Sequence, residues 1–331
     1  MSRGIRATLL LLACLLAGPV AAQQIKIATL APEGSAWMRE LRAAAAEVKA
    51  GTQGRVEVKF YPGGVMGNDA VVLRKMRLGQ LQGGVFTGSE LSLVYPDSQL
   101  YSLPFLFRDW DEVAAVRAQV DPLLAEGFER HGLHMLGLSG VGFAYIMGNK
   151  PLRSQADVAG IKLWVPQTDS IAIRTFELGG ISPIPLPIGD VFTSLQTGMV
   201  DTVANTPNGA IALQWHGRLR SLVDLPLSYV VGYLVLDDKA WKRLSPADQT
   251  VLAKAFGDAA ARMDASLRQD EAEALAALRR QGLVVTELEP AEAARWRGLG
   301  EQVMAELEAK RAISPELLAE VKRILAHQRA D

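Results

Sequence analysis

The sequence predicts an α/β protein of two lobes, a clamshell with crossing hinge strands and a long bracing helix. Strand-like and helix-like segments alternate from residue 24 to about residue 207, which is typical of mostly parallel sheets covered by helices. Two apolar, glycine-bearing segments, 134–148 and 221–238, have the character of strands that cross between lobes. From residue 245 to 282 the apolar spacing predicts a helix longer than most helices in globular domains.

The first lobe is expected to begin with a strand–helix repeat. The alternation in "QIKIATL" predicts a strand, and the amphipathic stretch after it predicts a helix that Gly51 ends. "RVEVKFY" predicts a second strand, which "PGG" breaks. The expected elements are, in order, strand 24–30, a helix within 31–54, strand 55–61, helix 68–80 and buried strand 81–88.

The second lobe is expected to repeat this order of elements, although no sequence repeat accompanies it. Pro166 ends one strand because it has no N–H for a ladder, and Gly198 ends one helix. The expected elements are crossing strand 134–148, a short helix at 154–160, strand 160–166, helix 168–180, Pro-rich strand 181–188, helix 189–198 and strand 199–207.

The C-terminal third is predicted to be nearly all helix. "SPAD" at 245–248 supplies an N-cap, a proline at the first helical position and an acid near the start. A strand at 283–290 and two further helices follow, the last beginning at Ser314. We therefore expect lobe I to comprise 23–143 and about 231–265, and lobe II 144–230 and about 266–331. The hinges are expected near 140–147 and 226–233.

Residues 1–22 have the pattern of a secretory signal peptide. An apolar run at 9–20 follows Arg3 and Arg6, and small residues precede Gln23. The run is too short to span a membrane in the mature protein, so we expect a periplasmic protein that begins near Gln23. An alternative is lipidation at Cys14, but the apolar run continues past that residue.

Composition excludes several classes of function. The chain of 331 residues has 35 Lys and Arg against 36 Asp and Glu, whereas a nucleic-acid partner would favour a basic chain. The one cysteine lies in the predicted signal, so the mature chain can form neither disulfides nor thiolate metal sites. We expect a monomer that binds a small molecule and no nucleic acid.

No catalytic or metal-binding set is evident. His131 and His134 are three residues apart, but no carboxylates cluster near them in the sequence. "GLSGV" at 137–141 lacks the last glycine of a nucleophile elbow, and neither a P-loop nor a dinucleotide fingerprint occurs. We therefore expect no metal, no cofactor and no enzymatic activity. An exported two-lobed protein of this kind fits the periplasmic-binding-protein clamshell, which closes on its ligand.

Three segments resemble a known family. "GRVEVKFYPGGVMG" at 54–67, "LPFLFRDWDE" at 103–112 and "PIPLPIGDVFTSLQTGMVD" at 183–201 are similar to the substrate-binding proteins of tripartite ATP-independent periplasmic (TRAP) transporters, DctP type. The likeness runs from about residue 25 past residue 270. It implies a receptor that delivers small organic solutes, usually carboxylates, to a membrane permease driven by an ion gradient.

The resemblance also draws attention to Trp164. In "GIKLWVP" the family would have an arginine at this position, which forms a bidentate salt bridge to the ligand carboxylate. The family's "V-D-G-x-E-N" is "VDTVAN" here, so Asn205 keeps the asparagine that bonds ligand while Thr202 and Ala204 replace the glycine and glutamate. An aromatic residue is often found where Ile188 stands.

Three interpretations of Trp164 remain open. The ligand is a carboxylate held by Asn205, the Trp164 N–H, backbone N–H groups and another cation, for which Arg174 is nearest in sequence. Alternatively, the ligand is neutral or cationic, with Asp169 as counter-charge and Trp164 as an aromatic wall. In the third interpretation Trp164 only fills the core. We favour direct contact, since Trp164 ends its strand where the family places a ligand contact.

Further candidate contacts come from loops at strand ends, where open α/β sheets bind ligands. For several of them helix capping or core packing is an equally good interpretation. They are Glu33, Ser35 and Trp37 after the first strand, Thr87, Ser89 and Glu90 after the third, Tyr145 in the first crossing strand, and Asn208 and Trp215 after Asn205.

The function predicted from the sequence is that of an extracytoplasmic solute receptor. It binds a small organic solute, an organic acid or related polar metabolite, and hands it to a TRAP permease. A periplasmic sensor that docks a signalling partner requires the same clamshell and is the alternative.

Overall fold

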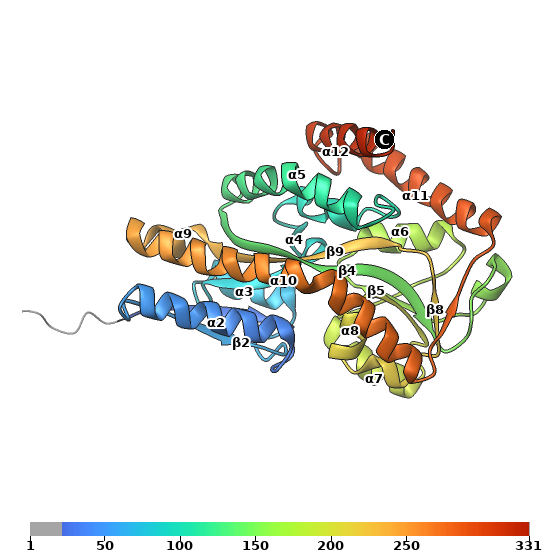
Figure 1. Ribbon diagram of the computed structural model, residues 1–331, viewed down its shortest axis with the longest axis horizontal. Coiled ribbons are helices and arrows are strands. Elements are labelled where there is room, and N and C mark those ends of the chain that lie inside the picture. The colour runs from blue at the N-terminus through green and yellow to red at the C-terminus, as the bar shows by residue number, and fades with distance from the viewer. Residues whose placement is uncertain (1–21, 331) are drawn as a thin grey trace, which may run out of the picture.

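The structure, a computed structural model, describes residues 22–330. The predicted signal peptide, apart from its last residue, and Cys14 lie outside the described residues. Two groups of α/β elements are joined by two long strands, β4 (Leu133–Gly148) and β9 (Ser228–Asp237), and by one long helix, α10 (Pro246–Arg280). Figure 1 shows α10 running past both groups, from α2 at one end to α7 and α8 at the other. The predicted two-lobed α/β fold is confirmed.

The strands follow one path, β2-β1-β3-β9-β4-β7-β5-β6, and β8 pairs with β4 and with β10. Pairs among β1–β3, among β5–β7 and between β8 and β10 are parallel, as predicted. The crossing strands β4 and β9 instead run antiparallel to every neighbour. The other strands are β1 (Gln23–Thr29), β2 (Val56–Tyr61), β3 (Gly83–Thr87), β5 (Leu163–Pro166), β6 (Ile184–Leu186), β7 (Thr202–Asn205), β8 (Ser221–Val223) and β10 (Val284–Thr286).

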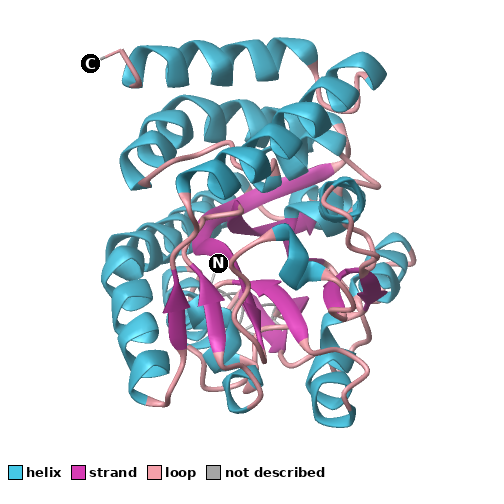
Figure 2. Ribbon diagram, turned by 90° about the vertical axis from the view of Figure 1, so that its right-hand side faces the viewer, coloured by secondary structure: helices cyan, strands magenta, loops and turns pink. Residues whose placement is uncertain are grey.

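Helices cover both faces of the strands (Figure 2). In the first lobe, α2 and the first half of α10 share one core cluster, and α3, α5 and α12 share another. In the second lobe, α7, α8 and the last turns of α10 cover one face, and α6 and α11 the other. The remaining helices are α2 (Ala36–Gly51), α3 (Asp69–Arg77), α4 (Gly88–Leu91), α5 (Trp110–Arg130), α6 (Ser170–Leu178), α7 (Val191–Thr197), α8 (Pro207–Ala212), α9 (Asp238–Lys242), α11 (Pro290–Lys310) and α12 (Pro315–Gln328), and 3-10 turns lie at Pro96–Ser102, Gln155–Val158, Ile188–Asp190 and Trp215–Gly217.

The predicted crossing segments and bracing helix are present. Segment 134–148 forms β4, and 221–238 forms β8 and β9 with a turn between them. The helix predicted from residue 245 is α10, with Ser245 as its N-cap. The predicted lobe boundaries stay a proposal, and one segment departs from them. The expected lobe II includes residues 266–331, but helix α12 packs on α5 of the first lobe. Val321 and Ile324 of α12 share a core cluster with Val116 of α5.

A buried ion-pair cluster fixes the crossing strand β4 between two helices. Arg117 on α5 places Nη1 2.9 Å from Asp264 Oδ1 on α10 and Nε 3.0 Å from Asp121 Oδ2. Arg117 Nη2 also donates to the Leu138 carbonyl. One guanidinium thus ties α5, α10 and β4 together.

Two chemical features of the described chain bear on function. Within residues 22–330 no helix combines the length and apolar character needed to cross a bilayer. In the same range no three His, Cys, Asp or Glu side chains gather closely enough to hold a metal ion. His131 Nδ1 instead contacts the Gly127 carbonyl, and His134 stacks on Trp241.

Candidate functional site

Tyr145 and Asn205 lie side by side where the two groups of elements meet. They are register partners in the β4–β7 pair. The Tyr145 ring is partly buried and packs against core clusters of both lobes. Asn205 Oδ1 accepts from the Thr206 N–H, but its amide nitrogen is buried and has no hydrogen-bond partner among residues 22–330. A buried donor without an acceptor costs free energy, so this nitrogen marks a place for a ligand acceptor.

Carboxylates from both lobes form a second group. Asp69 begins α3 and lies within hydrogen-bonding reach of Glu90 on α4. Burial, and then the Glu90 charge, raise the pKa of Asp69. Asp169, from the second lobe, caps α6 through the Ala172 N–H. Burial raises the pKa of Asp169 to about 6, helped by the Glu90 charge and opposed by backbone N–H groups, although its side chain keeps some solvent contact.

No cation offsets these three carboxylates in the described part of the chain. No Lys, Arg or His forms a salt bridge with Asp69, Glu90 or Asp169 there. Arg174, the nearest arginine in sequence, is instead bound to Glu306, with Nη2 2.7 Å from Oε1. This arginine is therefore engaged with a carboxylate on α11, away from Asp69, Glu90 and Asp169.

Trp164 lies inside the second lobe. Its side chain is only 2% exposed, and its Nε1 donates to the Leu186 carbonyl at 2.9 Å. Its ring meets that of Trp215 edge to face. The expectation that the indole N–H is free for a ligand is wrong, because a backbone carbonyl on β6 already accepts it. Contact between ligand and the ring stays a prediction.

The candidates after β1 have local partners. Glu33 pairs with Arg42 on the exposed start of α2, and this ion pair lowers the pKa of Glu33. Ser35 is the N-cap of α2 and accepts from the Met38 N–H. The Trp37 ring lies against Gly232 on β9, so closely that a Cβ at residue 232 would be 2.3 Å from it. Trp37 therefore touches a predicted hinge.

The remaining candidates are divided between capping and packing. The Thr87 N–H and hydroxyl both donate to Glu90 Oε2, and Ser89 contacts the Thr87 hydroxyl. Asn208 is partly buried on α8. Trp215 is 1% exposed, and no described residue accepts a hydrogen bond from its Nε1.

Sequence reasoning missed two carboxylates. Asp69 gives no functional signal in the sequence, because acidic residues are common in the first turn of a helix. Glu271 lies in "RQDEAEALAALRR" at 268–280, a stretch with the pattern of a solvated helix face, yet its side chain is buried and accepts from the Phe143 N–H at 2.9 Å. A signal for Glu271 existed in its spacing, since it lies seven residues after Asp264 and therefore on the same face of the helix.

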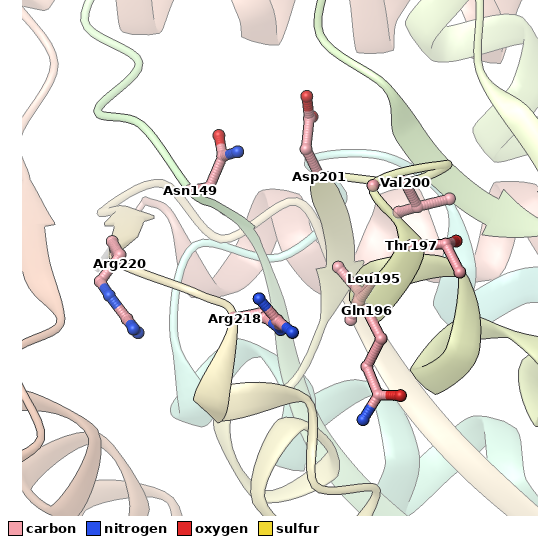
Figure 3. Close-up of a pocket in the computed structure, with 9 residues that line it drawn as sticks. Asn149, Leu195, Gln196, Thr197, Val200, Asp201, Arg218 and Arg220 are labelled. Atoms are coloured by element: carbon pink, nitrogen blue, oxygen red, sulfur yellow. The ribbon is translucent and has the colours of Figure 1, made fainter.

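A cavity of about 390 Å³ in the second lobe lies at the start of β7, and none of the predicted site residues lines it (Figure 3). Its lining includes Asp201, Arg218 and Arg220. In Figure 3 the two arginines and Asp201 point in different directions rather than toward one centre. This cavity therefore does not assemble the predicted contacts.

Comparison with known proteins identifies a family over most of the chain. Residues 27–311 match the family described as "Bacterial extracellular solute-binding protein, family 7", DctP. The sialic acid-binding periplasmic protein SiaP of Vibrio cholerae is 24% identical over 277 residues, covering 82% of this chain and 85% of that protein. The C4-dicarboxylate-binding periplasmic protein DctP of Rhodobacter capsulatus is 26% identical over 282 residues, covering 83% of each.

Solved structures show the same fold. A TRAP periplasmic solute-binding protein from Desulfovibrio salexigens, with bound orotic acid, superposes with a TM-score of 0.84 at 25% identity, covering 92% of this chain and 99% of that one. The similarity therefore includes both lobes and the elements that join them.

Proposed function

The chain belongs to family 7 of the bacterial extracellular solute-binding proteins, and from this we propose that it holds one small organic solute between its lobes, near Tyr145 and Asn205. The family comprises receptors for small organic molecules, and the chain is a TRAP-type solute receptor. Its partner is the membrane permease of a TRAP transporter. We infer further that it acts in the periplasm as a monomer, after loss of residues 1–22, and releases its ligand chemically unchanged.

The observation that supports this position is the orphaned Asn205 amide. Its nitrogen is buried and meets no acceptor in the described part of the chain, on the strand that pairs with β4 at Tyr145. A ligand oxygen there would restore a hydrogen bond worth about 0.5–1.5 kcal/mol and remove the cost of a bare donor. Asn205 also occupies the position at which the resemblance implies a ligand contact.

The carboxylates favour one ligand class over another. Asp69 and Glu90 from the first lobe and Asp169 from the second have no cation partner among the described residues. The pKa of Asp69 is raised to about 9, so this group holds its proton near pH 7 and the negative charge comes from Glu90 and Asp169. A dicarboxylate placed near those two groups would be repelled, whereas a protonated amine or quaternary ammonium would be attracted. We therefore propose a solute with a cationic group near Asp169 and an acceptor near Asn205. A simple organic acid, as relatives bind, is the second candidate.

A thermal-shift screen tests both proposals. It should compare organic acids, amines, zwitterions and polyols. A ligand at 100 times its Kd adds about 2.7 kcal/mol to the free energy of unfolding and raises the melting temperature. Asn205→Ala should lose most of the shift, and Glu301→Gln, an exposed change in the second lobe, should keep it. A hit that Asn205→Ala binds with unchanged affinity would remove Asn205 from the site.

The protein partner distinguishes a transport receptor from a sensor, and the chemical fate of the ligand distinguishes a receptor from an enzyme. Capture of the ligand-bound protein by reconstituted permease supports transport, and capture by a kinase ectodomain supports sensing. Recovery of the ligand intact after prolonged incubation supports a receptor, and conversion would indicate an enzyme.

A further inference from the structure

Helix α10 packs against both lobes through apolar residues. Between these contacts, acidic residues of α10 face the part of β4 where the strand bends. Leu252 and Phe256 pack under the first sheet, and Leu278 packs under the second. Between these contacts the inward face carries Asp264 and Glu271, which are seven residues apart and therefore on one side of the helix. Carboxylates on a face that is otherwise buried require partners.

Their partners are backbone N–H groups of β4. The register of β4 against β9 shifts between Gly140 and Gly142, so β4 contains an extra residue there. Such a bulge bends a strand and removes N–H groups from the ladder. Asp264 Oδ1 accepts the Gly140 N–H at 2.8 Å, and Glu271 Oε2 accepts the Phe143 N–H at 2.9 Å.

Gly142 shows how close Glu271 comes to the bend. Its φ of +119° is a conformation that favours glycine, and a Cβ there would lie 2.1 Å from Glu271 Oε2. The carboxylate thus lies directly against the backbone at the predicted hinge. Only a residue without a side chain permits this contact.

The two carboxylates differ in what else they bind. Asp264 is neutralised by Arg117. Glu271 is 7% exposed, forms no salt bridge with any described residue, and has the Tyr145 hydroxyl within hydrogen-bonding reach. Burial raises the pKa of Glu271 to about 7, and the Phe143 N–H and the Tyr145 hydroxyl oppose the shift. Tyr229 and Asp224 are the other titratable groups that influence this pair.

We propose that Glu271 is a positioning residue that couples the ligand site to the hinge, because one carboxylate accepts the Phe143 N–H at the β4 bend and lies within reach of the Tyr145 hydroxyl. Displacement of Tyr145 by a ligand shifts the same carboxylate that fixes the bend, so occupancy and lobe orientation change together. This inference rests on the proposed function, since it assigns Tyr145 to the ligand side.

The test combines substitutions at the two ends of this contact. Glu271→Ala removes the bond to Phe143 and the contact with Tyr145, Glu271→Gln keeps an acceptor for Phe143 without the charge, and Tyr145→Phe removes only the hydroxyl. Glu273→Gln, an exposed glutamate on the same helix, is the matched control. Ligand affinity is measured by calorimetry with a hit from the screen, and lobe closure by small-angle scattering.

Coupling predicts that Glu271→Ala and Tyr145→Phe each weaken binding by about fivefold or more. The double variant should bind no more weakly than the poorer single variant, and Glu271→Gln should recover part of the loss. Additive effects, or parent-like affinity and closure in folded Glu271→Ala, would overturn the coupling while leaving the receptor function intact.

A ligand-free measurement keeps the two proposals separate. With ¹³C-labelled tyrosines, the Tyr145 resonance of the parent should move with pH as the Glu271 carboxyl titrates, and it should not move in Glu271→Gln. A Tyr145 signal with the same pH response in both proteins contradicts the contact. If the parent binds nothing in the screen, the proposed function fails, and this spectrum still decides the contact.

Discussion

The rings of Trp164 and Trp215 meet edge to face, with centroids 5.1 Å apart and planes at 77°. Such aromatic pairs contribute roughly 0.5–1.5 kcal/mol beyond the burial of their surface. Trp164 also donates to the Leu186 carbonyl, so it joins β5, β6 and the turn that contains Trp215. The residue that replaces the family's arginine therefore has a structural role as well as a predicted ligand contact.

Replacing Trp164 should separate these two roles. Trp164→Ala leaves a cavity and should lower the free energy of unfolding by about 3–5 kcal/mol. Trp164→Phe keeps a ring against Trp215 and should cost less. Denaturant unfolding measures stability, and calorimetry measures ligand affinity. Direct contact requires Trp164→Phe to weaken binding as well, whereas parent-like affinity means that Trp164 only fills the core.

Arg117→Ala should destabilise the protein strongly. It leaves Asp121 and Asp264 without their cation in a largely buried cluster, a change that typically costs about 3–5 kcal/mol. Arg42→Ala is the matched control, because its pair with Glu33 is exposed to solvent and should contribute far less to the free energy of unfolding. If urea unfolding shows the same loss in the free energy of unfolding for both variants, the ion-pair cluster does not have the predicted stabilising role.

Glu271 should make stability depend on pH. Its folded pKa of about 7 exceeds the ordinary value of 4.5, so the folded state binds the proton more tightly between these values. The free energy of unfolding should therefore fall as pH rises from about 4.5 to 7, by on the order of 2–3 kcal/mol, and then level off. Glu271→Gln should lack this part of the decline. Parallel profiles for the two proteins would refute a raised pKa.

Asp169 should report the charge of the ligand. A cationic group placed beside it lowers its raised pKa, so binding near pH 6 should release protons. Calorimetry in buffers of different ionisation enthalpy measures that release, and Asp169→Asn should reduce it. An anionic ligand would instead cause proton uptake, which would decide for the organic-acid candidate.

Gly142→Ala should damage the β4 bend. The new Cβ would clash with the Glu271 carboxylate in an unfavourable backbone conformation, at a cost of about 2–5 kcal/mol. Gly217→Ala is the control, since a Cβ there meets no atom within 4 Å and should change stability by less than about 0.5 kcal/mol. Thermal unfolding of both variants gives the comparison.

The sequence predicted most of the architecture because its signals are local. Alternation, glycine stops and the "SPAD" cap located β1, α2, β4 and α10 within a few residues. The pairing of β9 between β3 and β4 was not predicted, since nothing local in 228–237 specifies partners far along the chain. Phe105, with φ of +54°, was also missed, because that conformation is rare outside glycine.

The candidate site was predicted less completely than the fold. Asn205 and Asp169 were predicted from strand ends and Tyr145 from the crossing strand. Asp69, beside Glu90, and Glu271, beside Tyr145, instead come from helices distant in sequence. For Trp164 the residue was predicted but its hydrogen-bond partner was not. Its position in the strand follows from the sequence, whereas the carbonyl that accepts its N–H lies on β6 and could be assigned only from the fold.

The place of β9 has a consequence for how the chain acquires its shape. Strand β9 pairs Val235 with Gly84 on one side and with Met135 on the other. A polypeptide synthesised only to about residue 220 would therefore have all of β3 and β4 but no strand between them. Both strands would present open edges, which recruit other chains. Because such distant pairings form slowly, nascent and truncated chains should depend on chaperones, whereas the complete chain can close its own edges.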